Sequence, residues 1–292
     1  MKKYFNNIGI VGIPRFKSSF VTHELLYFWL HKKGYNVFIE NNLVKKLFLI
    51  NPMVLSLSDI GKYCDLAIVI GGDGNILRAG RVLSSYKTFI IGINRGNFGF
   101  LTDLNYNNIF KTILKILSGK FKIEKRFLLE VKVYRKNIIL NKDIAINEIV
   151  IHPEKVTNMF EFDIFINGKF AFSQRSDGLI ISTPTGSTGY ALSAGGPIVE
   201  TSLDVIILLP MFAHTLSVRP LVINNNNIIY IKFKDVKGKL KISLDGNVVI
   251  PIKKNDIIFI SKSKLKLSLV HPLCYNYYDV LNVKLNWSKK FF

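Results

Sequence analysis

One stretch of this chain constrains its fold more than any other: an apolar run that ends in glycines. Residues 65–70 read Asp-Leu-Ala-Ile-Val-Ile, and residues 71–75 read Gly-Gly-Asp-Gly-Asn. A continuous apolar run rich in β-branched residues is typical of a strand buried on both faces of a parallel sheet. Ligands bind at the carboxyl ends of such strands, where glycines let backbone N–H groups approach phosphate oxygens. The stretch therefore predicts an α/β domain with a phosphate-binding turn.

Asp73 lies among these glycines, and its residue type allows three roles. The carboxylate can bind a metal, orient and deprotonate a hydroxyl group, or cap a helix, because Asp is a preferred N-cap residue. A helix is expected immediately after it, over residues 76–86. The stretch by itself leaves all three roles open.

Predicted strands alternate with predicted helices over the first 125 residues. The expected strands are 8–12, 35–39, 65–70 and 88–94, and the expected helices include one ending at Lys33, one over 41–50 and one over 107–117. Such alternation predicts βαβ units and a parallel sheet. A second glycine-rich turn, residues 94–100, follows the strand at 88–94, so two such turns are expected to face the same crevice.

The pattern becomes mostly β beyond residue 125. The clearest signal is a hairpin over residues 160–174 with Asn167-Gly168 at its turn. Further short strands are expected at 179–182, 205–209, 228–233, 240–244, 248–252 and 257–260. We expect a Rossmann-like parallel-sheet α/β domain over residues 1–125 and a β-rich, sandwich-like domain over 126–274. The tail, 275–292, is expected to return to the first domain.

The net charge of +20 admits two explanations. A basic protein can bind nucleic acid or an anionic membrane. However, only eight of the 40 basic residues are Arg, and the lysines are scattered. Lys, Asn, Ile, Phe and Tyr share A/T-rich codons, so genome composition also explains the excess. We favour genome composition and expect neither a nucleic-acid nor a membrane partner, although an anionic substrate would benefit from the positive field in either case.

The two cysteines and five histidines show no pattern of a structural site. Two thiols form neither a disulfide framework nor a zinc site, which favours a cytoplasmic protein. The histidines lack metal-ligand spacing. No apolar run approaches the roughly 18–20 residues that a membrane helix needs. The P-loop signature and the G-x-G-x-x-G fingerprint are both missing from the sequence, which argues against a P-loop kinase and a Rossmann dehydrogenase.

A third polar stretch, residues 175–197, lies in the β-rich half. Its centre, residues 183–190, reads Thr-Pro-Thr-Gly-Ser-Thr-Gly-Tyr. Hydroxyls, glycines and a proline in this density suit the presentation of hydroxyl groups and backbone donors to a ligand. Taken alone, the stretch is equally consistent with a turn before a helix.

Together these motifs resemble the bacterial NAD kinase family. The turn at 71–75, the segment 92–103, the pair Asn147-Glu148 and the stretch 177–197 occur in the family's order, and the resemblance runs from about residue 8 to the C-terminal Trp-Ser-Lys-Lys of residues 287–290. The resemblance implies ATP-dependent phosphorylation of the 2′-hydroxyl of the adenosine ribose of NAD, which produces NADP. It also implies Mg²⁺ or another divalent ion, carried by ATP near Asp73 rather than held by an assigned set of protein ligands, and a homotetramer or homodimer.

The resemblance also implies site residues. Asp73 matches the family's catalytic acid, which accepts the proton of the 2′-hydroxyl. We expect Arg78, one turn into the helix, to reach phosphate, with an exposed helix charge as an equal alternative. The expected substrate- and nucleotide-binding residues are Gly72, Gly74, Asn75, Arg78, Phe100, Asn147, Glu148, Asn158, Arg175, Asp177, Thr185, Thr188, Gly189, Tyr190, Ala191, Leu192, Ser193 and Asn247.

The sequence departs from the family pattern at three of the expected site residues. Relatives usually carry Ala at the position of Gly189, so the helix start there is expected to be looser. Asn158 and Asn247 lie where relatives carry other polar residues.

The GGDG turn also occurs in phosphofructokinases and in lipid kinases, and a dinucleotide-binding regulator without turnover is a further alternative. The choice between ATP and polyphosphate, and between NAD and NADH, is open.

Overall fold

The computed structural model describes residues 3–13, 20–94, 99–102, 104–105, 108–155, 159–215, 217–236 and 238–287, and it divides into two compact units. Unit 1 comprises residues 1–125 and 267–292, and unit 2 comprises residues 126–266. Strands β7 (Phe121–Arg135) and β18 (Ile257–Pro272) run across the two junctions. Each of these long strands therefore contributes residues to both units.

Unit 1 is built on a parallel sheet in the order β18-β5-β4-β1-β2-β3, with β6 beside β5. Its other strands are β1 (Asn7–Val11), β2 (Asn36–Glu40), β3 (Met53–Leu55), β4 (Leu66–Ile70), β5 (Phe89–Asn94) and β6 (Leu104–Asn105). All five residues of β4 are buried, as the apolar run predicted. The α/β fold expected for this half is confirmed.

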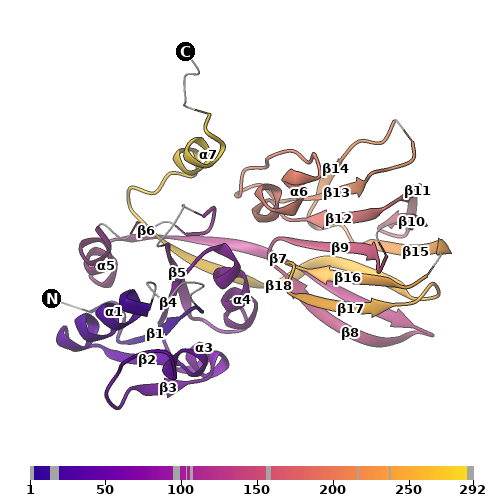
Figure 1. Ribbon diagram of the computed structural model, residues 1–292. Helices are drawn as coiled ribbons and strands as arrows, with labels where there is room; N and C mark the ends of the chain where they lie inside the picture. The colour runs from indigo at the N-terminus through magenta and orange to yellow at the C-terminus, as the bar shows by residue number, and fades with distance from the viewer. Residues whose placement is uncertain are drawn as a thin grey trace. The chain divides into compact units, whose positions relative to one another are not determined.

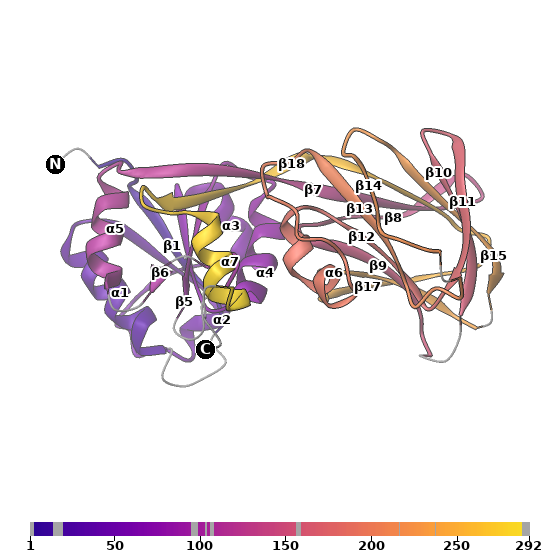
Figure 2. The same cartoon turned by 90° about the horizontal axis from the view of Figure 1, so that it is seen from above.

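Helices cover both faces of this sheet. The helices of unit 1 are α1 (Phe20–Lys32), α2 (Asn41–Val44), α3 (Leu57–Tyr63), α4 (Asp73–Leu83), α5 (Ile109–Leu117) and α7 (Tyr277–Leu285). Helices α1 and α5 lie on one face, and α3 and α4 on the other (Figures 1 and 2). Helices α3 and α4 pack closely against the sheet because Gly9 and Gly92 lack side chains. A Cβ at Gly92 would lie 2.4 Å from Ile76 of α4. Among the described residues, no helix has the length and apolar content needed to cross a membrane.

The structure differs from the predicted elements in the segment 41–63. The helix expected over 41–50 ends at Val44, and β3 and α3, which the sequence did not predict, follow. Leu43 and Leu47 are both buried and lie four residues apart, which imitates a longer helix. Asn51 then adopts a left-handed φ of 43°, and Pro52 follows it. Neither the left-handed backbone nor the proline continues a helix.

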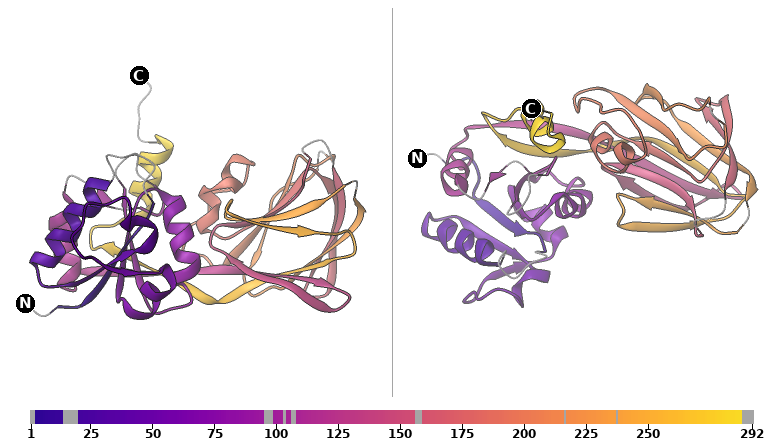
Figure 3. Two further views of the ribbon diagram at one scale, coloured as in Figure 1. Left: turned by 60° about the horizontal axis from the view of Figure 1, so that its bottom comes forward. Right: turned by 45° about the horizontal axis from the view of Figure 1, so that its top comes forward.

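Unit 2 consists of two antiparallel sheets packed face to face. One sheet has the order β14-β13-β12-β9-β16-β17; the other contains β11-β10-β15-β18, with β7 beside β18 and β8 beside β7. The remaining strands are β8 (Ile138–Ala145), β9 (Glu148–Pro153), β10 (Phe160–Ile166), β11 (Lys169–Ser176), β12 (Gly178–Ser182), β13 (Val205–Met211), β14 (Leu221–Asn224), β15 (Ile229–Val236), β16 (Leu240–Leu244) and β17 (Val248–Ile252). One apolar core joins inward-facing residues of both layers, which Figure 3 shows as separate sheets. The predicted sandwich-like half is confirmed.

Turn residues set the strand register in unit 2. Asn167 and Gly168 have φ values of 51° and 78°, which is the geometry of a two-residue hairpin turn, and β10 pairs with β11 as predicted. The expected strand at 257–260 extends to Pro272. Strand β9, whose residues are buried except for one, was not predicted as a strand. It lies at the centre of the six-stranded sheet and positions the Asn147-Glu148 pair at its start.

Candidate active site

Asp73 is the first residue of α4, and its carboxylate is held by a turn from another part of unit 1. Gly72, not Asp73, occupies the N-cap position of the helix. The N–H of Phe100 donates to Oδ2 at 2.8 Å, and the N–H of Leu101 donates to Oδ1 at 3.1 Å. Each carboxylate oxygen keeps acceptor capacity for a further hydrogen bond. The helix-cap role considered for Asp73 is therefore wrong, because its bonds lie outside α4.

The glycines around Asp73 fall into two classes. Gly71 has a φ of 145°, and a Cβ there would lie 2.3 Å from the Asn75 amide, so the fold itself requires glycine. A Cβ at Gly72 or Gly74 would meet no described atom within 4 Å, and neither residue has a positive φ. Both are exposed. The open space above these two positions suits the approach of a ligand to the backbone.

Asn75 and Arg78, both expected to contact nucleotide, bond to other parts of unit 1. The Asn75 side chain accepts from the Ile13 N–H at 2.8 Å and donates to the Ile13 carbonyl at 3.2 Å. Arg78 donates to both oxygens of Glu40 at 2.7 Å, and the Glu40 side chain is fully buried. Arg78 is thus not a free helix charge: it pairs with Glu40, and its side chain is 29% accessible. Its nucleotide contact stays a prediction.

The second glycine-rich turn is described only in part, because residues 95–98 and 103 lie outside the described residues. Its end, residues 99–102, packs directly on Asp73. A Cβ at Gly99 would lie 1.8 Å from Oδ1 of Asp73. Phe100 is half-buried, and the Lys284 ammonium lies 5.8 Å from the centre of its ring. The expectation that two glycine-rich turns meet at one edge of the sheet agrees with this contact.

In unit 2, the Asn147-Glu148 pair is positioned by Asp245, which follows β16. The Asp245 carboxylate accepts from the backbone N–H groups of residues 146, 147 and 148 at 2.9, 2.8 and 3.2 Å. Oδ1 of Asn147 and Oε2 of Glu148 are buried and find no hydrogen-bond partner among the described residues. Buried polar atoms are almost always paired. Two such atoms on consecutive residues therefore indicate a place where a ligand supplies the missing partners.

Glu148 is also electrostatically unusual. The pKa of its carboxyl group is raised to about 8, mainly by burial and also by the negative charge of Asp245, while a hydrogen bond from the Tyr190 N–H opposes the shift. The side chain is therefore largely protonated at neutral pH before any ligand binds. Perturbed carboxyl groups in a cleft are typical of binding and catalytic sites.

The hydroxyl-rich loop packs against this pair. It forms a short 3₁₀ helix, η3 (Thr185–Thr188), and one turn of helix, α6 (Tyr190–Ser193). A Cβ at Gly186 would lie 2.3 Å from the Asn147 carbonyl oxygen, and one at Gly189 would lie 3.1 Å from Oε2 of Glu148. The structure thus brings together the pair and the loop. Within the loop, Thr185 and Ala191 are buried, Thr188, Gly189 and Leu192 are partly buried, and Tyr190 and Ser193 are exposed.

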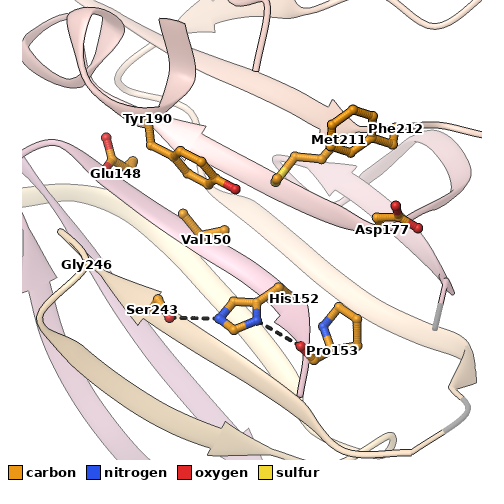
Figure 4. Close-up of a pocket in the computed structure, with 10 residues that line it drawn as sticks. All are labelled: Glu148, Val150, His152, Pro153, Asp177, Tyr190, Met211, Phe212, Ser243 and Gly246. Carbon is orange, nitrogen blue, oxygen red and sulfur yellow. Dashed lines mark hydrogen bonds between the residues drawn. The ribbon is translucent and has the colours of Figure 1, made fainter. Parts of the chain in front are cut away.

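A pocket of about 370 Å³ opens on the outer face of the six-stranded sheet. Figure 4 shows the Tyr190 ring over Val150, with Glu148 at one end and Asp177 beside Met211 at the other. The pocket is lined by Glu148, Val150, His152, Pro153, Asp177, Tyr190, Met211, Phe212, Ser243 and Gly246. An aromatic ring, apolar side chains and a few polar groups form a surface that suits a flat heterocycle.

Comparison with known proteins decides the family. Residues 8–121 match the ATP-NAD kinase N-terminal domain, and residues 146–272 match the ATP-NAD kinase C-terminal domain. The NAD kinase of Buchnera aphidicola subsp. Schizaphis graminum is 59% identical over 292 residues, which is the full length of both chains. The chain belongs to the NAD kinase family. The resemblance inferred from the motifs is confirmed.

Solved structures carry the same fold. The yeast NADH kinase complexed with NADH superposes with a TM-score of 0.88 at 25% identity, over 98% of this chain and 89% of that one. An NAD kinase from Archaeoglobus fulgidus in complex with ATP has a TM-score of 0.71 at 23% identity, over 95% of this chain and 98% of that one. The second likeness bears on the fold alone.

Within this NAD kinase fold, sequence reasoning missed part of the pocket. Val150 and His152 lie two and four residues beyond Glu148 on β9, and alternate residues of a strand share one face. That period would have found them once β9 was identified as a strand. The His152 ring bonds to the Pro153 carbonyl at 2.9 Å and to the Ser243 hydroxyl at 2.8 Å. Ser243 comes from a neighbouring strand, which no local motif indicates.

Of the remaining predicted contact residues that the structure describes in unit 2, only one lines the pocket. Asp177 lines the pocket, whereas Arg175, two residues earlier, is exposed and accepts the His214 N–H at its carbonyl. Asn247 is exposed, and its side chain donates to the Asp245 carbonyl at 3.0 Å. Asn158 lies outside the described residues. These roles stay predictions.

Proposed function

We propose that this chain transfers the γ-phosphoryl group of ATP to the 2′-hydroxyl of the adenosine ribose of NAD, with Asp73 as the proton acceptor. The hydroxyl oxygen bonds to the γ-phosphorus, the bond from that phosphorus to the β–γ bridging oxygen breaks, and ADP leaves. The hydroxyl proton passes to Asp73. Support comes from the family and from the Asp73 carboxylate, which is fixed by two backbone N–H groups beside two open glycines.

The mechanism depends on position more than on basicity. Phosphoryl transfer passes through a loose transition state, so the protein contributes mainly orientation and electrostatic stabilisation. The backbone at Gly72 and Gly74 is proposed to bind phosphate oxygens, and the unit 2 pocket to bind part of NAD. Asn147 and Glu148 are proposed to bind ribose hydroxyls, because each carries a buried oxygen without a described partner.

Residues 185–193 and Asp177 of unit 2 are proposed as further nucleotide contacts, and Phe100 of unit 1 is proposed as another. The proposed contacts of the loop are Thr185, Thr188, Gly189, Tyr190, Ala191, Leu192 and Ser193. Arg175 and Asn247 are proposed as peripheral contacts. For Asn75 and Arg78, the bonds to Ile13 and Glu40 indicate an indirect contribution.

We propose that a divalent metal ion reaches this site bound to ATP. No three His, Cys, Asp or Glu side chains gather into a metal site among the described residues. Mg²⁺ commonly uses one or two carboxylates together with substrate phosphates. Asp73 can supply one carboxylate, and the ion would neutralise phosphate charge when bound.

The decisive observation for this function is the Asp73 carboxylate on its backbone donors, and the test is NADP formation. Wild type should convert NAD to NADP with ATP and Mg²⁺, and Asp73→Asn should lose most of kcat while still binding NAD. Asp279→Asn, a change of an exposed carboxylate on α7, serves as the matched control and should keep full activity. No NADP from wild type would remove the proposal.

We also propose a cytoplasmic homotetramer or homodimer. Cys64 and Cys274 are free thiols, which suits a reducing compartment. Apolar residues are exposed on β8, where Ile138 is 66% and Ile139 48% accessible, and such side chains are often covered by a second subunit. Light scattering behind size-exclusion chromatography measures the mass, and a monomer at micromolar concentration would contradict this proposal.

A further inference from the structure

Asp73 owes its position to a short turn, residues 99–102, as much as to its own helix. The turn places two N–H groups on the two carboxylate oxygens. It also presses against the carboxylate, because only the absence of a Cβ at Gly99 leaves room for Oδ1. Any shift of this turn therefore moves the hydrogen-bond donors that orient Asp73.

The Thr102 hydroxyl holds this turn closed. Its oxygen accepts from the Gly99 N–H at 2.9 Å and from the Asn94 amide at 3.2 Å. A hydroxyl oxygen has two acceptor sites and one proton. With both acceptor sites used, the proton is left for Oδ1 of Asp73, which lies 3.5 Å away. Thr102 therefore joins the end of β5, the turn and the carboxylate through one atom.

The burial of Thr102 makes this arrangement a rigid one. The residue is 1% accessible, and its methyl group faces Gly92 of β5, where an added Cβ would come within 3.0 Å. In Thr102→Val the side chain keeps its shape but loses the hydroxyl. The Gly99 N–H and the Asn94 amide are then left without this acceptor. The hydroxyl can thus be removed while the packing is kept.

We propose that Thr102 is a positioning residue for phosphoryl transfer, acting through the turn 99–102 to orient the carboxylate of Asp73. This inference rests on the proposed function. It assigns Thr102 no contact with NAD or ATP. A misplacement of about 1 Å far from the reacting atoms can cost about 100-fold in rate, which is the scale that loss of this hydroxyl can reach.

The test compares Thr102→Val with Thr102→Ser and with a matched control. Thr88→Val removes another buried Thr hydroxyl of unit 1, one that bonds to the carbonyls of Gly61 and Cys64, away from Asp73. We expect Thr102→Val to lower kcat at least about tenfold with KM for NAD and ATP within about twofold. Thr102→Ser should restore most of kcat. Thr88→Val should lower the melting temperature but keep kcat.

A second comparison shows whether Thr102 acts through Asp73. In an Asp73→Asn background, adding Thr102→Val should lower kcat little further, because the carboxylate that it orients is already gone. Full kcat in Thr102→Val, or a raised KM with unchanged kcat, would overturn the inference, as would full additivity of the two changes. Wild type without NADP formation would instead overturn the proposed function.

Discussion

The packing of the described residues does not require glycine at position 72 or at position 74. A methyl group at either position meets no described atom within 4 Å, and Gly72 has an ordinary φ of −81°. Gly72→Ala is therefore expected to leave the melting temperature within about 2 °C of wild type. If phosphate approaches this backbone, the same methyl group should raise KM for ATP about tenfold, which is roughly 1.4 kcal/mol of binding free energy.

Gly99→Ala is the matched contrast, because its methyl group would lie on Oδ1 of Asp73. We expect this variant to lose kcat by about 100-fold through displacement of the carboxylate. Steady-state kinetics with both substrates separate the two effects. Unchanged KM for ATP in Gly72→Ala would show that phosphate does not approach that backbone.

Glu148 makes stability depend on pH in a direction opposite to that of a salt-bridged carboxylate. Its pKa is about 8 in the folded protein, against 4.5 for the unperturbed group. Between these values the folded state holds a proton that the unfolded state releases, so stability is complete below the unfolded pKa and falls as pH rises towards 8. The loss can reach roughly 5 kcal/mol across this window.

Glu148→Gln should remove most of this slope, because glutamine does not ionise. The measurement is the free energy of unfolding by urea at several values between pH 5 and pH 8, for both proteins. Glu154→Gln, at an exposed carboxylate just beyond β9, serves as the control and should keep the wild-type slope. Equal slopes in Glu148→Gln and wild type would contradict the raised pKa.

At the scale of elements, the middle of α4 is tied to the end of strand β2 by a partly buried ion pair between Arg78 and Glu40. Glu40 has no accessible side-chain surface, and both of its oxygens accept from Arg78 at 2.7 Å. Arg78→Met leaves this carboxylate buried without its partner, which typically costs about 3–5 kcal/mol. The paired change Glu40→Gln with Arg78→Met should recover most of that loss in a urea titration.

The same variants decide what Arg78 does in catalysis. If Arg78 binds phosphate, the double variant keeps a raised KM for ATP even after its stability recovers. If Arg78 only fixes α4 through Glu40, KM for ATP should stay near the wild-type value. Lower stability in the double variant than in Arg78→Met would show that the pair does not act as one unit.

Local patterns predicted some elements and could not predict others. The run 66–70 and the turn Asn167-Gly168 carry their structures in adjacent residues, and both formed as expected. The bonds of Asp73 to residues 100 and 101, by contrast, join segments 27 and 28 positions apart. Arg78 similarly meets Glu40 across 38 positions. Motifs therefore identified the residues of the candidate site. The hydrogen-bond partners of these residues could not be predicted, because they depend on which strands lie next to each other in the sheet.

At the scale of the whole molecule, unit 1 is discontinuous, because residues 267–292 belong with residues 1–125. The returning segment begins inside β18, whereas the sequence placed its start at residue 275. Leu267, Leu269 and Val270 are at most 2% accessible, and Leu269 pairs with Ile90 of β5. Part of the unit 1 core therefore comes from the end of the chain.

A chain that stops after residue 266 should fail to fold unit 1, although it contains all of residues 1–125. Loss of a buried aliphatic side chain costs roughly 2–5 kcal/mol, so three of them approach the whole stability of a typical domain. A chain that stops after residue 274 keeps them and should retain the cooperative unfolding of unit 1 with a lower melting temperature, because it lacks α7 and its buried Leu281. Calorimetry and hydrogen exchange at β4 measure both chains. Equal protection of β4 in the two would show that residues 267–274 are dispensable for unit 1.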